Sequence, residues 1–142
     1  MDMKKFLALI LFFTSISQGV YASGWKSAGN NTYLNSKSIL PYYNERHEII
    51  NNQYSFWTRH FNDGGEYFKQ KEAGLKSKIS IIHTRYIIDC PNKAVANKTI
   101  LIYDEKSRII KRENRTTDIL DFIPIKENTP ASFFYRNICT TN

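Results

Sequence analysis

Two cysteines, Cys90 and Cys139, are the residues of this 142-residue chain whose chemistry is easiest to interpret. In an oxidising compartment an even number of cysteines most simply forms disulfides. The alternative is a catalytic thiol, which needs a histidine partner and a lowered pKa. His83 lies seven positions before Cys90 on the same predicted strand, so the two side chains would point to opposite faces. We therefore predict a Cys90–Cys139 disulfide, which would stabilise the fold by about 4 kcal/mol through loop closure.

The remaining candidates for catalysis or metal binding form no recognisable site. The histidines His47, His60 and His83 are scattered, with no cysteine or carboxylate at the spacing of metal ligands. No glycine-rich phosphate loop or nucleophile elbow is present. Asp118 and Asp121 could act as paired carboxylates, but their apolar neighbours favour two solvated side chains at the edge of a strand or loop. We therefore expect no catalytic residue, no metal site and no cofactor, and interpret the protein as a non-enzyme.

Basic side chains gather around a predicted turn at residues 104–107, and only three acidic residues offset them. The cluster consists of Lys98, Lys106, Arg108, Lys111, Arg112 and Arg115, beside Asp104, Glu105 and Glu113. Alternation along the following strand would place Arg108 and Arg112 on one face and Lys111 on the other. One interpretation is a solvated sheet face whose charges discourage aggregation. The other is a patch for an anionic partner, with Lys106, Arg108, Lys111, Arg112 and Arg115 as the partner-binding residues.

The first 22 residues have the order of features typical of a secretory signal peptide. Lys4 and Lys5 precede an apolar run at residues 6–13, and Val20 to Ala22 supply a cleavage site. The alternative is a membrane anchor, but this run is far shorter than the roughly 20 residues that span a bilayer. We expect residues 23–142 to be exported to the periplasm, cell surface or medium as one domain, without stable membrane insertion.

The composition indicates a folded and basic domain. The chain is 42% hydrophobic and 14% aromatic, which argues against disorder. Removing the predicted signal peptide takes away Lys4, Lys5 and Asp2, so the net charge falls from +7 to +6. Such a charge either serves solubility alone or attracts lipopolysaccharide, polysaccharide or acidic protein. Nucleic acid is an unsuitable partner for an exported protein.

Short strands and turns follow one another along residues 25–113. The pattern predicts a hairpin at 25–35 and strands at 47–60, 78–90, 95–103 and 108–113. It also predicts a loop or helical turn at 37–41 and a long loop at 66–75. In the predicted strand at 47–60, Trp57 and Arg59 alternate with Phe56. In the predicted strand at 78–90, His83 and Arg85 lie on the face opposite Tyr86 and Cys90. Consecutive strands with short turns predict an antiparallel meander.

A C-terminal helix is predicted after Thr129, which suits an N-cap, and Pro130, which suits the first helical position. At helical spacing Phe134, Ile138 and Cys139 share one face, together with Tyr135. This stripe would pack on the sheet and bring Cys139 towards Cys90. The predicted fold class is therefore α+β: a meandering antiparallel sheet with a C-terminal α-helix packed on it and one disulfide.

The landmarks of the chain occur in the order of a known family. They are a Trp followed by Tyr33-Leu34-Asn35, an aromatic strand ending Phe56-Trp57-Thr58, then Tyr86-Ile87-Ile88-Asp89-Cys90, a Tyr103-Asp104 turn, and Ile123-Pro124 before the helix. Over essentially the whole mature chain this resembles the surface-adhesin E family of small exported bacterial domains. Lys106-Ser107 departs from the pattern, which has glycine in that turn.

The resemblance implies a meandering sheet, a packed C-terminal helix and a disulfide. It also implies adhesion, since the family's namesake binds host extracellular-matrix proteins and vitronectin. No ligand contact of the adhesin matches a motif here, so no binding residue is transferred. We interpret the protein as an exported non-enzymatic binding module for a protein or an anionic envelope or host polymer. The alternative is a periplasmic inhibitor or immunity-type protein that blocks a secreted enzyme or toxin.

Overall fold

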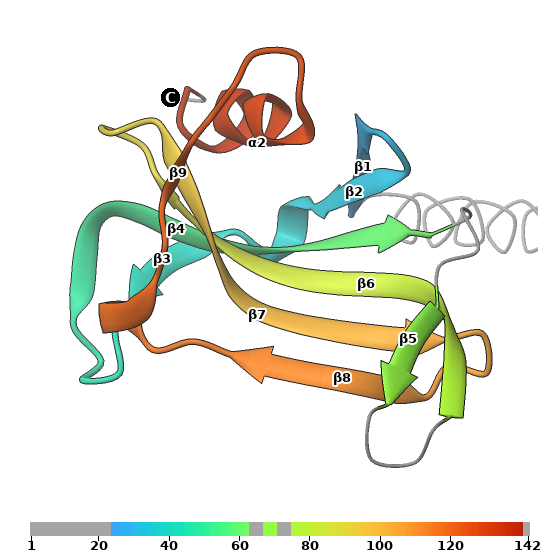
Figure 1. Cartoon of the computed structure of the whole chain (residues 1–142). Coiled ribbons are helices and arrows are strands. Elements are labelled where there is room, and N and C mark those ends of the chain that lie inside the picture. The colour runs from blue at the N-terminus through green and yellow to red at the C-terminus, as the bar shows by residue number, and fades with distance from the viewer. Residues whose placement is uncertain (1–23, 63–66, 71–74, 141–142) are drawn as a thin grey trace, which may run out of the picture.

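The computed structural model describes residues 24–62, 67–70 and 75–140 (Figure 1). The predicted signal peptide, residues 1–22, lies outside these ranges. In order, the elements are β1 (Trp25–Gly29), β2 (Thr32–Asn35), the 3-10 turn η1 (Ser36–Ser38), β3 (Leu40–Tyr43), β4 (Ile49–Phe61), β5 (Tyr67–Gln70), β6 (Leu75–Asp89), β7 (Ala94–Asp104), β8 (Ile109–Asn114), the 3-10 turn η2 (Thr117–Ile119), β9 (Ile123–Pro124) and α2 (Pro130–Ile138).

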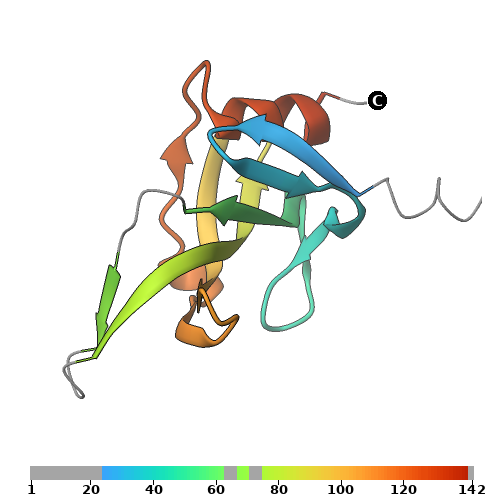
Figure 2. The same cartoon turned by 90° about the vertical axis from the view of Figure 1, so that its right-hand side faces the viewer.

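The described strands form one antiparallel sheet whose main order is β1-β2-β4-β6-β7-β8. Three shorter strands pair at its margins: β3 with β4, β5 with β6, and β9 with β7. The sheet is strongly curled, and α2 lies across one of its faces (Figure 1). In the turned view β1 lies beside α2 at the top of the molecule (Figure 2). The predicted α+β meander with a packed C-terminal helix is confirmed.

The main core lies between α2 and the concave face of the sheet. Leu34, Phe56, Ile88 and Phe134 are buried there as one cluster. The Phe56 ring centroid lies 5.1 Å from that of Phe134 and 5.7 Å from that of Tyr86. Phe56 and Tyr86 are register partners on β4 and β6. The alternation along both strands therefore places Phe56 and Tyr86 under the helix.

The helix begins as the sequence predicts. The Thr129 hydroxyl accepts a hydrogen bond from the Ser132 amide, and the Ser132 hydroxyl accepts one from the Thr129 amide, which together form a capping box. Pro130 occupies the first turn, where its missing N–H costs no hydrogen bond. Phe134 is only 2% exposed, whereas Ile138 is partly buried at the rim of the core.

A disulfide closes the far end of this helix. Cys90 follows the last residue of β6, and Cys139 is the C-cap of α2. Their sulfurs are bonded, with the Cα atoms 5.5 Å apart, so the predicted pairing is confirmed. One covalent bond thus joins the helix to the sheet. Within the described residues no helix is long and apolar enough to cross a membrane.

Two local predictions differ from the structure. Residues 66–75 were expected to be a loop, but Tyr67–Gln70 forms β5, which pairs with Leu75–Lys78 at the start of β6. The connection at 37–41 is a 3-10 turn that leads directly into β3. Asp118 lies in η2 and Asp121 lies outside any strand, and both are exposed, as expected for solvated carboxylates.

Replacing Phe134 by alanine should lower the free energy of unfolding by about 3 kcal/mol or more, because a buried ring is removed and a cavity is left. Urea denaturation followed by circular dichroism measures the loss. The matched control is Ile119→Ala, whose side chain is 59% exposed, with an expected change below about 0.5 kcal/mol. Equal losses in the two variants would show that Phe134 does not anchor the helix.

Removing the disulfide with Cys139→Ala should cost about 2–5 kcal/mol of unfolding free energy, since the helix loses its tie to the sheet. Thermal denaturation with and without dithiothreitol measures this. The reductant should lower the Tm of the wild type towards that of the variant and leave the variant unchanged. A wild-type Tm that does not respond to complete reduction would contradict the prediction.

Candidate functional site

The predicted basic cluster is divided among different environments. Arg108 donates from Nε to Oδ2 of Asp104 at 2.8 Å, and the Asp104 side chain is only 3% exposed. Backbone amides of Lys106 and Arg108 donate to the same carboxylate. These bonds, above all the one from the Arg108 amide, hold the pKa of Asp104 below its usual value. Arg108 is thus part of the turn, and Lys106 lies exposed at its tip.

Glu113 offsets two more members of the cluster. Its carboxylate lies 2.9 Å from Nε of Arg115 and 3.8 Å from Nζ of Lys111. The structure therefore neutralises Arg108, Lys111 and Arg115 locally. The two pairs with Glu113 are solvent-accessible and contribute little stability, but all three pairs reduce the net field of the hairpin.

A bulge in β8 overturns the predicted arrangement of its faces. Ile109 pairs with Tyr103 and Lys111 pairs with Ile102, which leaves Ile110 as an extra residue. An extra residue reverses the alternation of side chains beyond it. Arg112, paired with Leu101, consequently shares a face with Ile109 and not with Arg108. The prediction that Arg108 and Arg112 act from one face is wrong.

Lys98, which the sequence placed beside the hairpin cations, is withdrawn from the surface. It lies at a bulge of β7 with its side chain 8% exposed. Its Nζ donates to Oε1 of Glu45 at 3.2 Å and to the backbone oxygen of Arg115. The amide and hydroxyl of Thr117 donate to the same carboxylate at 2.8 Å. Lys98 therefore joins η2 to the connection between β3 and β4.

The face of the sheet opposite α2 carries a coherent set of functional side chains, of which Arg112 is exposed and the others are half-buried. Strand register aligns one row across five strands: Tyr33 beside Arg59, Arg59 beside His83, His83 beside Leu101, and Leu101 beside Arg112. We call these five residues, together with Arg85 of the neighbouring row, the arginine platform. Neighbouring register partners add Trp57 beside Arg85 and Phe61 beside Ile81 on the same face. No aspartate or glutamate occupies any of these positions.

Arg59 is held at the centre of an aromatic cage. Its guanidinium carbon lies 4.1 Å from the ring centroid of Trp25, 5.7 Å from that of Tyr33 and 5.2 Å from that of Phe61. Its Nε is buried and has no hydrogen-bond partner within the described residues. Ring faces attract a cation through their quadrupole, so the cage fixes the guanidinium without neutralising its charge.

His83 and Arg85 determine, together with Arg59, the charge of this face. His83 packs against Tyr103 with ring centroids 5.1 Å apart, and burial, followed by the charge of Arg59, lowers its pKa. The neutral imidazole is therefore favoured beside the arginine. Arg85 donates from Nη2 to the Ser55 hydroxyl at 3.2 Å, a neutral partner that leaves its charge uncompensated.

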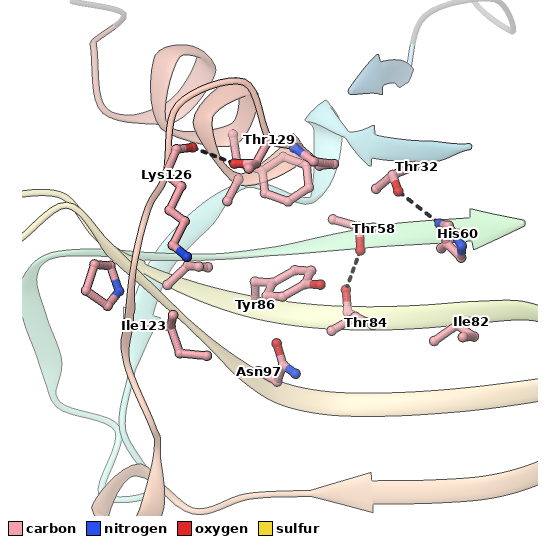
Figure 3. Close-up of a pocket in the computed structure, with 15 residues that line it drawn as sticks. Thr32, Thr58, His60, Ile82, Thr84, Tyr86, Asn97, Ile123, Lys126 and Thr129 are labelled. Atoms are coloured by element: carbon pink, nitrogen blue, oxygen red, sulfur yellow. Dashed lines mark hydrogen bonds between the residues drawn. The ribbon is translucent and has the colours of Figure 1, made fainter. Parts of the chain in front are cut away.

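The other face of the sheet holds a groove of about 580 Å3 under α2 and β9 (Figure 3). Its apolar lining includes Ile82, Tyr86, Val95 and Phe134, with Ile123 at the rim. Tyr86 is largely buried, which raises the pKa of its hydroxyl and keeps it neutral. The sequence carries no local signal for this groove, because it arises from the spacing between α2 and the curled sheet.

Thr58, Thr32 and His60, three of the polar residues that line the groove, already have hydrogen-bond partners. The Thr58 hydroxyl donates to the Thr84 carbonyl at 3.3 Å (Figure 3). His60 Nδ1 lies 3.0 Å from the Thr32 hydroxyl, which itself donates to the Asn30 carbonyl. Because a hydroxyl has one proton, Thr32 then accepts from His60, which is the reverse of what an activated nucleophile requires. Within the described chain no group of three His, Cys, Asp or Glu residues could hold a metal ion.

The architecture defines a class of protein: a curled antiparallel meander whose only described α-helix is C-terminal and disulfide-tethered to the sheet. Solved structures of Haemophilus influenzae protein E share it. Crystal form II matches with a TM-score of 0.56 and 16% identity over 83% of this chain and 88% of that one. Protein E from a non-typeable strain matches with a TM-score of 0.54 and 17% identity over 83% and 76%. The chain therefore has a protein E-like fold, the surface-adhesin E fold that the sequence resembles.

No protein-family model matches the chain, and no curated protein sequence matches it. At 16–18% identity the structural matches show the fold alone. The likeness is nevertheless extensive, since a further protein E structure is covered over 89% of its length. The fold is thus established independently of any sequence family.

The Glu45 network predicts a specific pH dependence. The bond from the Thr117 hydroxyl, with other hydrogen bonds, lowers the pKa of Glu45 from 4.5 to about 2. Because the folded pKa is depressed, the stabilisation by charged Glu45 is complete above pH 4.5 and is lost as the pH falls towards 2. Glu45→Gln should therefore be less stable than wild type at pH 7 and lose less stability on acidification.

Unfolding free energies measured by urea between about pH 5 and pH 2 test this linkage. Glu127→Gln serves as the control, because the Glu127 side chain is 84% exposed and lies 3.8 Å from Lys93. The control should follow the wild-type curve. A Glu45→Gln curve parallel to wild type would mean that the network does not set the acid response.

Proposed function

We propose that this protein is an exported, non-enzymatic binding domain whose arginine platform docks onto an acidic surface of a partner protein. The observation that carries the proposal is the caged Arg59. Three aromatic rings hold it in one row with His83 and Arg112, without a carboxylate in that row. Charge complementarity therefore favours an acidic partner.

The composition of this face favours an interface over a solvated surface. Trp25 and Phe61 are each 37% exposed, and the cations among them are arginines. Tryptophan, tyrosine and arginine are enriched in protein interfaces, and lysine and glutamate are depleted there. A guanidinium already fixed by rings loses little conformational entropy on binding. The face thus combines large contact area with preorganised charge.

The fold and its disulfide support the remaining parts of the proposal. The protein E-like fold is the fold of the adhesin family that the sequence resembles. A disulfide between Cys90 and Cys139 suits an oxidising compartment, in agreement with the signal-like residues 1–22. A binding role requires no catalytic group, and the hydrogen bonding of His60 opposes its use as a base towards Thr32. The proposed site is the platform, with Arg112 as the contribution of the basic hairpin.

A matched pair of triple variants tests the platform against the rest of the hairpin. Arg59→Gln, Arg85→Gln and Arg112→Gln together should weaken binding to immobilised vitronectin by about tenfold or more, since three uncompensated charges are lost. Lys106→Gln, Arg108→Gln and Lys111→Gln remove the same charge from the hairpin and should bind nearly as wild type. Surface plasmon resonance at low and high salt measures both, and wild-type binding should weaken as salt screens the charges.

Two results would reject the proposed site. Unchanged binding by the folded platform variant, or an equal loss in the hairpin variant, would show that the platform does not recognise the partner. Circular dichroism checks that both variants fold. If the platform triple unfolds, Arg85→Gln with Arg112→Gln replaces it, because neither residue belongs to the cage. Heparin in place of vitronectin distinguishes an anionic polymer from a protein as the partner.

A further inference from the structure

The groove under α2 lies on the opposite face from the arginine platform, so it can bind a ligand independently of the proposed function. Its volume of about 580 Å3 falls within the range of small-molecule sites, roughly 300–1,000 Å3. The lining is mostly apolar, and its walls come from elements that are fixed in place. Val95 on β7 pairs with Ile123 on β9, and Phe134 anchors α2 in the core.

One full charge lies in this lining. It is Lys126, whose side chain runs from the segment before α2 down towards the groove (Figure 3). No aspartate or glutamate lines the groove, and Lys126 makes no ion pair within the described chain. The adjacent Glu127 lies 3.8 Å from Lys93 instead. The Lys126 backbone is held, because its carbonyl accepts the Thr129 hydroxyl at 2.6 Å. An unpaired cation beside an apolar cavity favours one anionic group on the ligand.

The body of the ligand must be apolar rather than peptide-like. The floor consists of β4, β6 and β7, which are interior strands whose backbone groups are paired within the sheet. An added peptide strand therefore finds no free edge in this floor. The hydroxyls of Thr58 and Thr32 are also engaged. The amides of an extended peptide would remain unpaired against this lining, whereas an alkyl chain requires no partner.

We propose that the groove binds a single-chain carboxylate amphiphile, a fatty acid, with its alkyl chain along Tyr86, Val95 and Phe134. Its carboxylate pairs with the Lys126 amine at the rim. Burial of the chain supplies the affinity, and the ion pair sets the orientation of the ligand. The occupant is thus defined by one apolar chain and one negative charge, the two properties that the lining complements.

Isothermal titration with dodecanoate, below its micellar concentration, tests the head-group contact. Lys126→Gln should weaken dodecanoate binding by about fivefold, the effect of one partly exposed ion pair. The control Lys106→Gln, at the tip of the hairpin, should leave it unchanged. Dodecanol, which lacks the charge, should bind wild type and Lys126→Gln with equal affinity. This double-mutant cycle isolates the ion pair from any general loss of stability.

Two equally exposed isoleucines test the position of the alkyl chain. Ile123, at the rim of the groove, is 58% exposed, and Ile119, in η2 outside the lining, is 59% exposed. Ile123→Asp should abolish measurable dodecanoate binding, because it brings a carboxylate beside the chain and the anionic head. Ile119→Asp should bind as wild type. Since both side chains are exposed, both variants should fold, which circular dichroism verifies.

The proposal is overturned if dodecanoate fails to bind the wild type, if Ile123→Asp binds it normally, or if dodecanol shows the same dependence on Lys126. The platform triple variant should retain dodecanoate binding, and Ile123→Asp should retain vitronectin binding. Failure of the groove proposal and failure of the proposed function are therefore observed in separate measurements.

Discussion

Docking of α2 onto the concave face of the sheet is the interaction on which the rest of the structure depends. A helix of nine residues has little stability of its own, because nucleation is costly and few hydrogen bonds follow. Thr129 caps its start, Phe134 fills the core beneath it, and Cys139 ties its end to Cys90. A small domain buries a limited fraction of its surface, so this covalent bond supplements a modest core. The same docking forms the roof of the groove.

The two faces of the sheet carry different side chains because side chains alternate along every strand. On the concave face Phe56 and Tyr86 form the core, and residues further along the same strands line the groove. On the opposite face their neighbours Trp57 and Arg85 remain accessible. One set of strands thus presents an apolar groove on one face and a cationic surface on the other, built from different residues.

The distribution of charge shows why a count of basic residues does not locate a binding surface. The hairpin carries many cations, yet Asp104 and Glu113 lie against three of them, and Lys98 is buried beside Glu45. The opposite face of the sheet has fewer cations, but none of their described neighbours is acidic. Arg59 lies against aromatic rings, and Arg85 donates to a serine hydroxyl. The electric field of a cation extends further into solvent when no nearby carboxylate neutralises the cation. The surface field is therefore set by the partners of each cation.

The sequence alone determined the local features and the fold class. Alternation placed Phe56 and Tyr86 inward, the Thr129-Pro130 pair started the helix, and two cysteines in a chain with a signal-like start indicated the disulfide. Alternation and the helix start depend only on residues a few positions apart. The disulfide was predicted from the even number of cysteines and from the oxidising compartment that an exported protein enters. The same alternation put Trp57 and Arg59 on one face of their strand, and His83 and Arg85 on one face of theirs.

Tertiary structure decided which of these groups meet. Strand register brought Arg59 beside His83, and one extra residue at Ile110 turned Arg112 towards that row and away from Arg108. Register depends on long-range pairing, and a single inserted residue reverses a face without leaving a sequence signature. The groove likewise exists only as the space between a helix and a curled sheet. Local chemistry is therefore encoded along the chain, whereas the sites arise from how distant segments are aligned.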